Sequence, residues 1–329
     1  MKPFSLSSWR WRFLFGVALV AALPALVDLR RLGAAVARAD GPLLGAALAA
    51  AGGAIVVLEA RRFQAAFAGW DLRYGAALRI TLASLFVGSF TPGAVGAEAY
   101  KLYAVHRRGE GVVRPVVKLA LLRLLGAAAL AAAIAAAGLA APAGFGAVAR
   151  RLAWRWPAGR WFAGRWFAGR FPLPALGAAA LVVLSLAALG LGWPRLAPRL
   201  REAWRQGREA LAEVRPAQAG EIFLLSLGVA LLRGVSLTFL VRSFGESVPF
   251  ADLLGVVALS LLAGTLPISP AGLGVQEGIL AGCLVFFHVP PPSAVAIALL
   301  SRAFLWLFAA IGGWALAASR RALPRPAPR

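Results

Sequence analysis

The apolar residues of this chain gather in blocks of roughly 20, the length a helix needs to cross the hydrocarbon core of a bilayer. Six such blocks follow one another along the sequence: residues 13–27, 42–58, 116–139, 173–193, 222–241 and 293–318. With 60% of 329 residues apolar and a mean hydropathy of +0.77, no single soluble core could bury them all. We therefore predict an all-α integral membrane protein with about six spanning helices.

Two further apolar regions, residues 76–103 and 253–287, are interrupted in the middle by proline and glycine. Proline removes a backbone donor and ends a helix, and glycine permits positive φ or a close approach. Within lipid, such backbone is tolerated only where protein or a water-filled cavity satisfies its polar groups. A helix that starts after such a break directs unpaired N–H groups into the interior, where an anion could dock. We therefore predict two re-entrant hairpins near the centre of the molecule, with breaks at Pro92, Gly93, Gly96, Pro270, Gly272 and Gly274.

The two breaks share one pattern, TPGAVGAE at residues 91–98 and SPAGLGVQE at residues 269–277. Each ends on a glutamate, and an arginine follows 25 residues later in the next apolar block: Glu98 with Arg123, and Glu277 with Arg302. The order of blocks around each break is also the same, which is typical of transporters built from inverted repeats. We predict a single transmembrane domain over residues 1–329, with one half at about 13–139, a basic aromatic loop at 140–172, a second half at about 173–318 and a basic tail at 319–329.

Basic residues outnumber acidic ones by 35 to 13, and most of them lie between the apolar blocks. This placement favours cytoplasmic anchoring of membrane helices over nucleic-acid binding. It predicts cytoplasmic N- and C-termini and an external loop at residues 243–252, in the cytoplasmic (inner) membrane. One segment conflicts with this topology, since residues 150–171 should be external yet carry six arginines in a Trp- and Arg-rich tandem repeat. It could be an interfacial segment or a tolerated loop.

Ionisable side chains at bilayer depth are costly and normally find partners. Glu98 and Glu277 could therefore form structural ion pairs with Arg123 and Arg302 that fix each hairpin to the following helix. Alternatively, the arginines could line one polar cavity between the halves and bind a lipid phosphate there, while the glutamates bind a cationic headgroup or a proton. Lys101, three residues after Glu98, and Gln276, directly before Glu277, complete the candidate translocation site. Arg79 and Arg233 are weaker candidates.

Catalytic and metal-binding patterns are missing from the sequence. Cys283 is the single cysteine, and His106 and His288 have no Cys or carboxylate partner at ligand spacing. We therefore expect no enzyme activity, no metal and no cofactor, and a membrane-embedded enzyme is the weakest of the three functions considered.

The segments FTPGAVGAEAYKLY (90–103) and LPISPAGLGVQEG (266–278) resemble the flippase-like transmembrane family, which includes the membrane region of lysylphosphatidylglycerol synthase, the multiple peptide resistance factor. The similarity runs from about residue 61 to 314. The chain departs from the family pattern where Ala97 and Ala271 replace a second glycine, Gln276 replaces a basic residue and Leu122 replaces an acid. Without an acid at Leu122, Arg123 needs Glu98 or Glu277 as its partner.

The resemblance implies translocation of a phospholipid or another polar-headgroup lipid across the cytoplasmic membrane. The alternative is a non-catalytic scaffold or accessory protein for lipid or isoprenoid-lipid biosynthesis, such as that of hopanoids. Aminoacyl transfer is not implied, because in the family it belongs to a separate soluble domain, for which we see no room after Ala318. The expected partners are membrane lipids with a phosphate, zwitterionic or cationic headgroup, and in addition a lipid-synthesising enzyme or a second copy of the chain.

Overall fold

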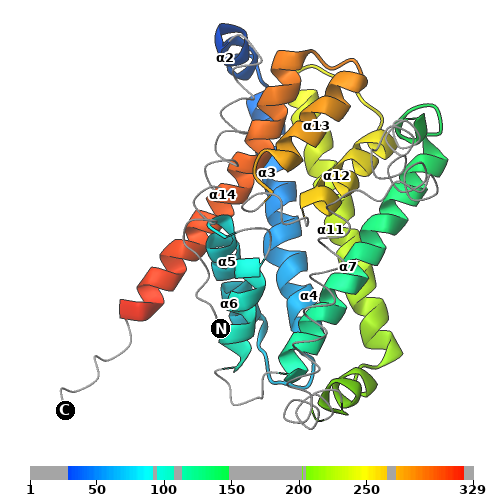
Figure 1. The fold of residues 1–329 in the computed structure, drawn as a ribbon. Coiled ribbons are helices and arrows are strands. Elements are labelled where there is room, and N and C mark those ends of the chain that lie inside the picture. The colour runs from blue at the N-terminus through cyan, green and yellow to red at the C-terminus, as the bar shows by residue number, and fades with distance from the viewer. Residues whose placement is uncertain are drawn as a thin grey trace, which may run out of the picture.

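The computed structural model describes residues 29–91, 95–106, 113–147, 202, 205–264 and 272–321, and its regular elements are all helical (Figure 1). Four helices are long and apolar enough to cross a bilayer: Gly41–Ala66, Val113–Ala140, Pro216–Ser243 and Pro291–Ala318. The predicted all-α class is confirmed, and these helices correspond to four of the six expected spans. The other two, and the Trp- and Arg-rich repeat, fall outside the described residues.

The first long helix joins α3 (Gly41–Gly52), a π-helical segment η1 (Gly53–Leu58) and α4 (Glu59–Ala66). The Asp40 side chain caps its start by accepting from the Leu43 amide at 2.9 Å. The expected end at Leu58 is wrong by eight residues, because the first charges after the apolar block do not end the helix. It continues because Glu59 and Arg62, one turn apart, neutralise each other across 2.9 Å.

Short helices come in two pairs, α5 (Tyr74–Ser89) with α6 (Val95–His106), and α12 (Phe250–Gly264) with α13 (Val275–Phe286). A long helix precedes and follows each pair, with α7 (Val113–Ala140) after the first, α11 (Pro216–Ser243) before the second and α14 (Pro291–Arg321) after it. In Figure 1 the α5–α6 pair occupies the lower half and the α12–α13 pair the upper half, with the broken ends directed toward the middle. The order long, short, short, long therefore occurs twice.

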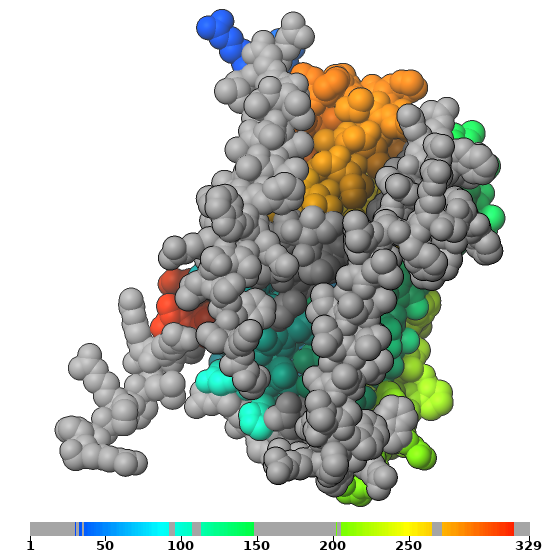
Figure 2. All heavy atoms as spheres, viewed as in Figure 1, coloured from blue at the N-terminus to red at the C-terminus, as the bar shows by residue number. Residues whose placement is uncertain are grey.

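One short helix of each set packs against a long helix of the other set, where the sets are α3–α7 and α11–α14. Helix α5 packs on α14, α12 packs on α7, and α3 packs on α11. In Figure 1, α11 runs opposite to α3–α4, and α14 runs opposite to α7. On the face in Figure 2, the orange surface around α13 lies above the cyan and teal surface around α6, so both pairs border the same side.

Small residues allow the closest of these contacts. A Cβ placed on Gly312 of α14 would overlap the backbone carbonyl of Leu82 in α5, and one on Gly313 would overlap the Phe86 ring. Helices in lipid associate through such small residues because apolar side chains gain nothing by leaving lipid for protein. The α5–α14 contact is therefore a backbone-to-backbone approach that only glycine permits.

We expect Gly312→Ala to lower the free energy of unfolding by about 1–3 kcal/mol, because the obstructing atom is backbone and cannot rotate away. Gly282→Ala on α13 is the matched control, since no atom lies within 4 Å of its added methyl group. Thermal unfolding of the purified protein in detergent measures both. Equal melting temperatures for the two variants would contradict the close packing of α5 on α14.

Candidate functional site

The second break places Glu277 in the first turn of α13. Gly272 and Gly274 adopt φ of +70° and +79°, the left-handed conformations expected of glycine here. Oε2 of Glu277 accepts from the Gly274 amide at 2.7 Å. The prediction that the start of this helix offers free N–H groups to an anion is wrong at Gly274, because the helix's own carboxylate occupies the donor.

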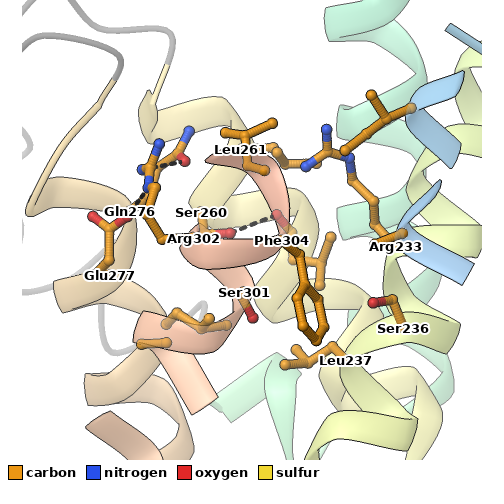
Figure 3. A pocket seen from close by; sticks show the side chains of 16 residues that line it. Arg233, Ser236, Leu237, Ser260, Leu261, Gln276, Glu277, Ser301, Arg302 and Phe304 are labelled. Atoms are coloured by element: carbon orange, nitrogen blue, oxygen red, sulfur yellow. Dashed lines mark hydrogen bonds and ion pairs between the residues drawn. The ribbon is translucent and has the colours of Figure 1, made fainter. Parts of the chain in front are cut away.

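The other carboxylate oxygen of Glu277 binds Arg302 of α14. Oε1 of Glu277 accepts from Nε of Arg302, and Nη2 of Arg302 donates to Oε1 of Gln276 at 2.8 Å (Figure 3). Glu277 and Arg302 are only 3% and 5% exposed. The predicted contact between these two residues is confirmed, and it joins α13 to α14 through a buried, charge-compensated pair.

Gln276 is held against α12 as well as against Arg302. A Cβ on Gly264, the last residue of α12, would overlap the Gln276 amide group. Gly272 also lies close to α12, since a Cβ added to it would stand 3.1 Å from the Gly264 Cα. Gln276 thus accepts a hydrogen bond from Arg302. A lysine or arginine at this position could not accept it, because neither side chain has an acceptor atom.

The first half has a related but more open cluster. Oε1 of Glu98 lies 3.6 Å from Nε of Arg123 and 3.5 Å from Nζ of Lys101. The Arg123 side chain is 44% exposed, against 4% for Arg302. In the absence of an acid at Leu122, we expected Glu98 or Glu277 to pair with Arg123, and the structure shows that Glu98 does. In this cluster one carboxylate pairs with two cations, and the arginine of the Glu98–Arg123 pair is partly exposed.

The start of α6 is also closed by a side chain. The Gly96 amide donates to Oγ1 of Thr91 at 3.1 Å, and a Cβ on Gly96 would overlap that same side chain. Gly96 is therefore needed for close approach, and its amide is not available to an anion. Pro92, Gly93 and Pro270, the remaining candidates at the breaks, fall outside the described residues.

A cavity of about 90 Å³ lies beside Arg302. Its lining comes from α3, η1, α11, α12, α13 and α14, and its polar members are Arg233, Ser236, Ser260, Gln276, Glu277, Ser301 and Arg302 (Figure 3). Arg123 and Glu98 do not belong to this lining. The expectation that both arginines line one cavity is therefore wrong for this one, because Arg123 lies in the more exposed cluster of the other half.

Three charged residues in the long helices, Glu59, Arg62 and Arg233, take part in this region although the sequence patterns did not single them out as strong candidates. Glu59 pairs with Arg62, whose Nη1 also donates to Oγ of Ser226 on α11 at 3.2 Å. Arg233 of α11 lines the cavity, although its sequence context shows no acid partner. The signal that could have found the first two is an acid and a base one helical turn apart, directly after a long apolar run.

The described residues contain no group of three or more His, Cys, Asp or Glu that could hold a metal ion. What they do offer is a buried arginine–glutamate–glutamine cluster at a helix break, next to a small cavity with a second arginine. Such an arrangement can bind an anionic or zwitterionic group inside an otherwise apolar helix assembly.

Comparison with known proteins identifies the family. The model for the lysylphosphatidylglycerol synthase TM region matches residues 12–313. The chain belongs to this family. A UPF0104 membrane protein of Methanothermobacter thermautotrophicus is 35% identical over 94 residues, which is 28% of this chain and 28% of that relative. The match therefore spans less than a third of the relative's length. Membership and the four apolar helices together make this a multi-pass membrane protein.

We expect Arg302→Gln to cost about 3–5 kcal/mol of stability, because it leaves the buried Glu277 carboxylate without its cation. The matched variant Arg123→Gln should cost less than about 1 kcal/mol, because Arg123 is half exposed and Lys101 still pairs with Glu98. Melting temperatures in the same detergent test the difference. The burial asymmetry would be refuted by a larger loss for Arg123→Gln than for Arg302→Gln.

Proposed function

We propose that this protein moves a phospholipid, or another lipid with a polar headgroup, across the cytoplasmic membrane. The observation that carries the proposal is the cavity beside Arg302, which places two arginines, one glutamate and several hydroxyls among apolar membrane helices. Polar groups at such depth are expensive and are typically retained for a substrate path. The family description, which names the membrane region of a lipid-modifying enzyme, supports a lipid as the cargo.

The proposal includes an inverted-repeat architecture. In its favour are the repeated order of long and short helices, the exchange of α5 and α12 between the halves, and the opposed directions of α11 and α3–α4. Inverted repeats allow one half to rock against the other around a central site, which opens the site to each side in turn. The breaks at the ends of α5 and α12 are the positions where such motion would reach the cargo.

Within this mechanism the chain supplies charge rather than covalent chemistry. Glu277 and Gln276 orient the Arg302 guanidinium, whose planar set of donors suits a phosphate. In the other half, Oε2 of Glu98 is buried without a hydrogen-bond partner among the described residues, so Glu98 is the acid we assign to a cationic headgroup or a coupling proton. No step needs a nucleophile, a metal or a cofactor.

The second candidate is an accessory protein that holds lipid-synthesising enzymes at the membrane. It is favoured by the family description, which names a region of a synthase and not a transporter. A scaffold requires the fold but not the polarity of the cavity. The two functions therefore differ in how they respond to changes that preserve the fold and alter the polar site.

We expect Arg302→Lys to reduce lipid translocation at least tenfold while protein abundance falls much less, because lysine keeps the charge but loses the planar fork. The assay reconstitutes purified protein in liposomes and follows a headgroup-labelled phospholipid between the leaflets. Arg242→Lys, at the exposed end of α11, is the control and should behave as wild type. Wild-type protein that moves no lipid, whatever its headgroup, would leave the accessory role as the better explanation.

Orientation is tested separately. In a Cys283→Ser background, we expect Ser247→Cys, in the connection from α11 to α12, to react with an impermeant maleimide in intact cells. Arg73→Cys, in the equivalent connection from α4 to α5, should react only after lysis, because inverted halves place these loops on opposite sides. Labelling of both cysteines from one side would rule out the inverted arrangement.

A further inference from the structure

Arg233 lies on α11, across the cavity from Arg302. Figure 3 shows Arg302 with Gln276 and Glu277 on one side and Arg233 on the other. The Nε atom of Arg233 is buried and has no hydrogen-bond partner among the described residues. A buried guanidinium donor without an acceptor is rare in folded proteins, because no hydrogen bond offsets the free-energy cost of removing the donor from water.

The acids near Arg233 are engaged by other cations. Glu59, its acidic neighbour, is paired with Arg62 at 2.9 Å. Glu277 is paired with Arg302, which faces Arg233 as a second positive charge. The cavity is lined by Arg233, Arg302 and Glu277, and the Glu59–Arg62 pair lies next to Arg233 outside the lining. In this set of five charged residues, the three arginines outnumber the two glutamates by one positive charge.

The cavity itself has the size of one small anion. Its volume of about 90 Å³ is large for a protein void, since a single water needs only about 10–15 Å³. Several water-sized groups fit, which matches the four oxygens of a phosphate and not a complete lipid headgroup. Ile55, Leu237, Leu261, Phe304 and Leu305 form the apolar part of the lining, against which the glycerol or chain region of a lipid could lie.

We propose that Arg233 and Arg302 together bind one phosphate group in this cavity, with Arg233 as the residue whose charge the ligand neutralises. The inference rests on the proposed function and adds the residue that recognises the cargo. The single negative charge of a phosphodiester matches the single excess cation, and arginine binds phosphate oxygens through several donors in one plane. Arg302 is already held by Glu277 and Gln276, so Arg233 sets the affinity.

The test measures melting temperature in a non-ionic detergent and a phosphate-free buffer, with three probes: dioctanoyl phosphatidylglycerol, dioctanoylglycerol and inorganic phosphate. For wild type we expect a rise with phosphatidylglycerol and none with dioctanoylglycerol, which lacks the phosphate. Arg233→Met should lose this rise while melting, without ligand, at or above the wild-type temperature, because it removes an unpaired buried charge. Arg242→Met, on the exposed end of the same helix, should keep the wild-type rise.

Arg233→Lys serves if the methionine variant does not fold, and should show a reduced rise because lysine keeps only the charge. A full phosphatidylglycerol response in either Arg233 variant overturns the proposal, as does an equal response to dioctanoylglycerol in wild type. A rise with inorganic phosphate alone, lost in Arg233→Met, supports the site and identifies free phosphate as its ligand. If the phosphate-dependent rise is intact but no lipid crosses the liposome bilayer, the transport function fails and the phosphate site stands.

Discussion

The described structure depends on one constraint, that a charged side chain among apolar helices must find its partner within the protein. No water in the hydrocarbon core can replace a missing partner. This explains why one carboxylate oxygen of Glu277 accepts from Arg302 and the other from the Gly274 amide. The same residue therefore caps α13 and neutralises the charge of Arg302 on α14. It also explains why α4 continues past Leu58 through Glu59 and Arg62. Among the described residues, buried charged side chains leave an atom without a hydrogen-bond partner at Nε of Arg62, Nε of Arg233 and Oε2 of Glu98, and the phosphate site proposed above would supply a partner for Arg233.

The two halves use the same motif with different burial. Both glutamates reach the arginine 25 residues ahead, yet Glu277 and Arg302 are enclosed, whereas Arg123 is 44% exposed. Lys101 adds a second cation in the first half, and its Nζ also lies 5.7 Å from the centre of the Phe63 ring. The first cluster is thus the more exposed one at its arginine, although Oε2 of its glutamate is buried without a hydrogen-bond partner among the described residues. The two clusters therefore share one motif but differ in how far solvent or lipid can reach the arginine.

Glycine has two separate functions in this fold. At Gly272 and Gly274 it provides the left-handed backbone that turns the chain into α13. At Gly96, Gly264 and Gly312 it provides space, for Thr91, for Gln276 and for the backbone of α5. Only the first function makes a break in the helix, but the second determines how closely the short helices approach their partners and therefore where the polar side chains meet.

The sequence by itself determined the class of protein and the position of the breaks, and it offered the pairing of Glu98 with Arg123 and of Glu277 with Arg302 as one of two alternatives. It could do so because hydropathy blocks, proline–glycine breaks and repeat spacing are local properties of the chain. Tertiary structure alone decided which pair is buried, that the helix starts at Gly96 and Gly274 are capped internally, and that Arg233 faces Arg302 across a cavity. Those facts depend on how α11 lies against α13 and α14, and no pattern along a single helix encodes the distance between residues on different helices.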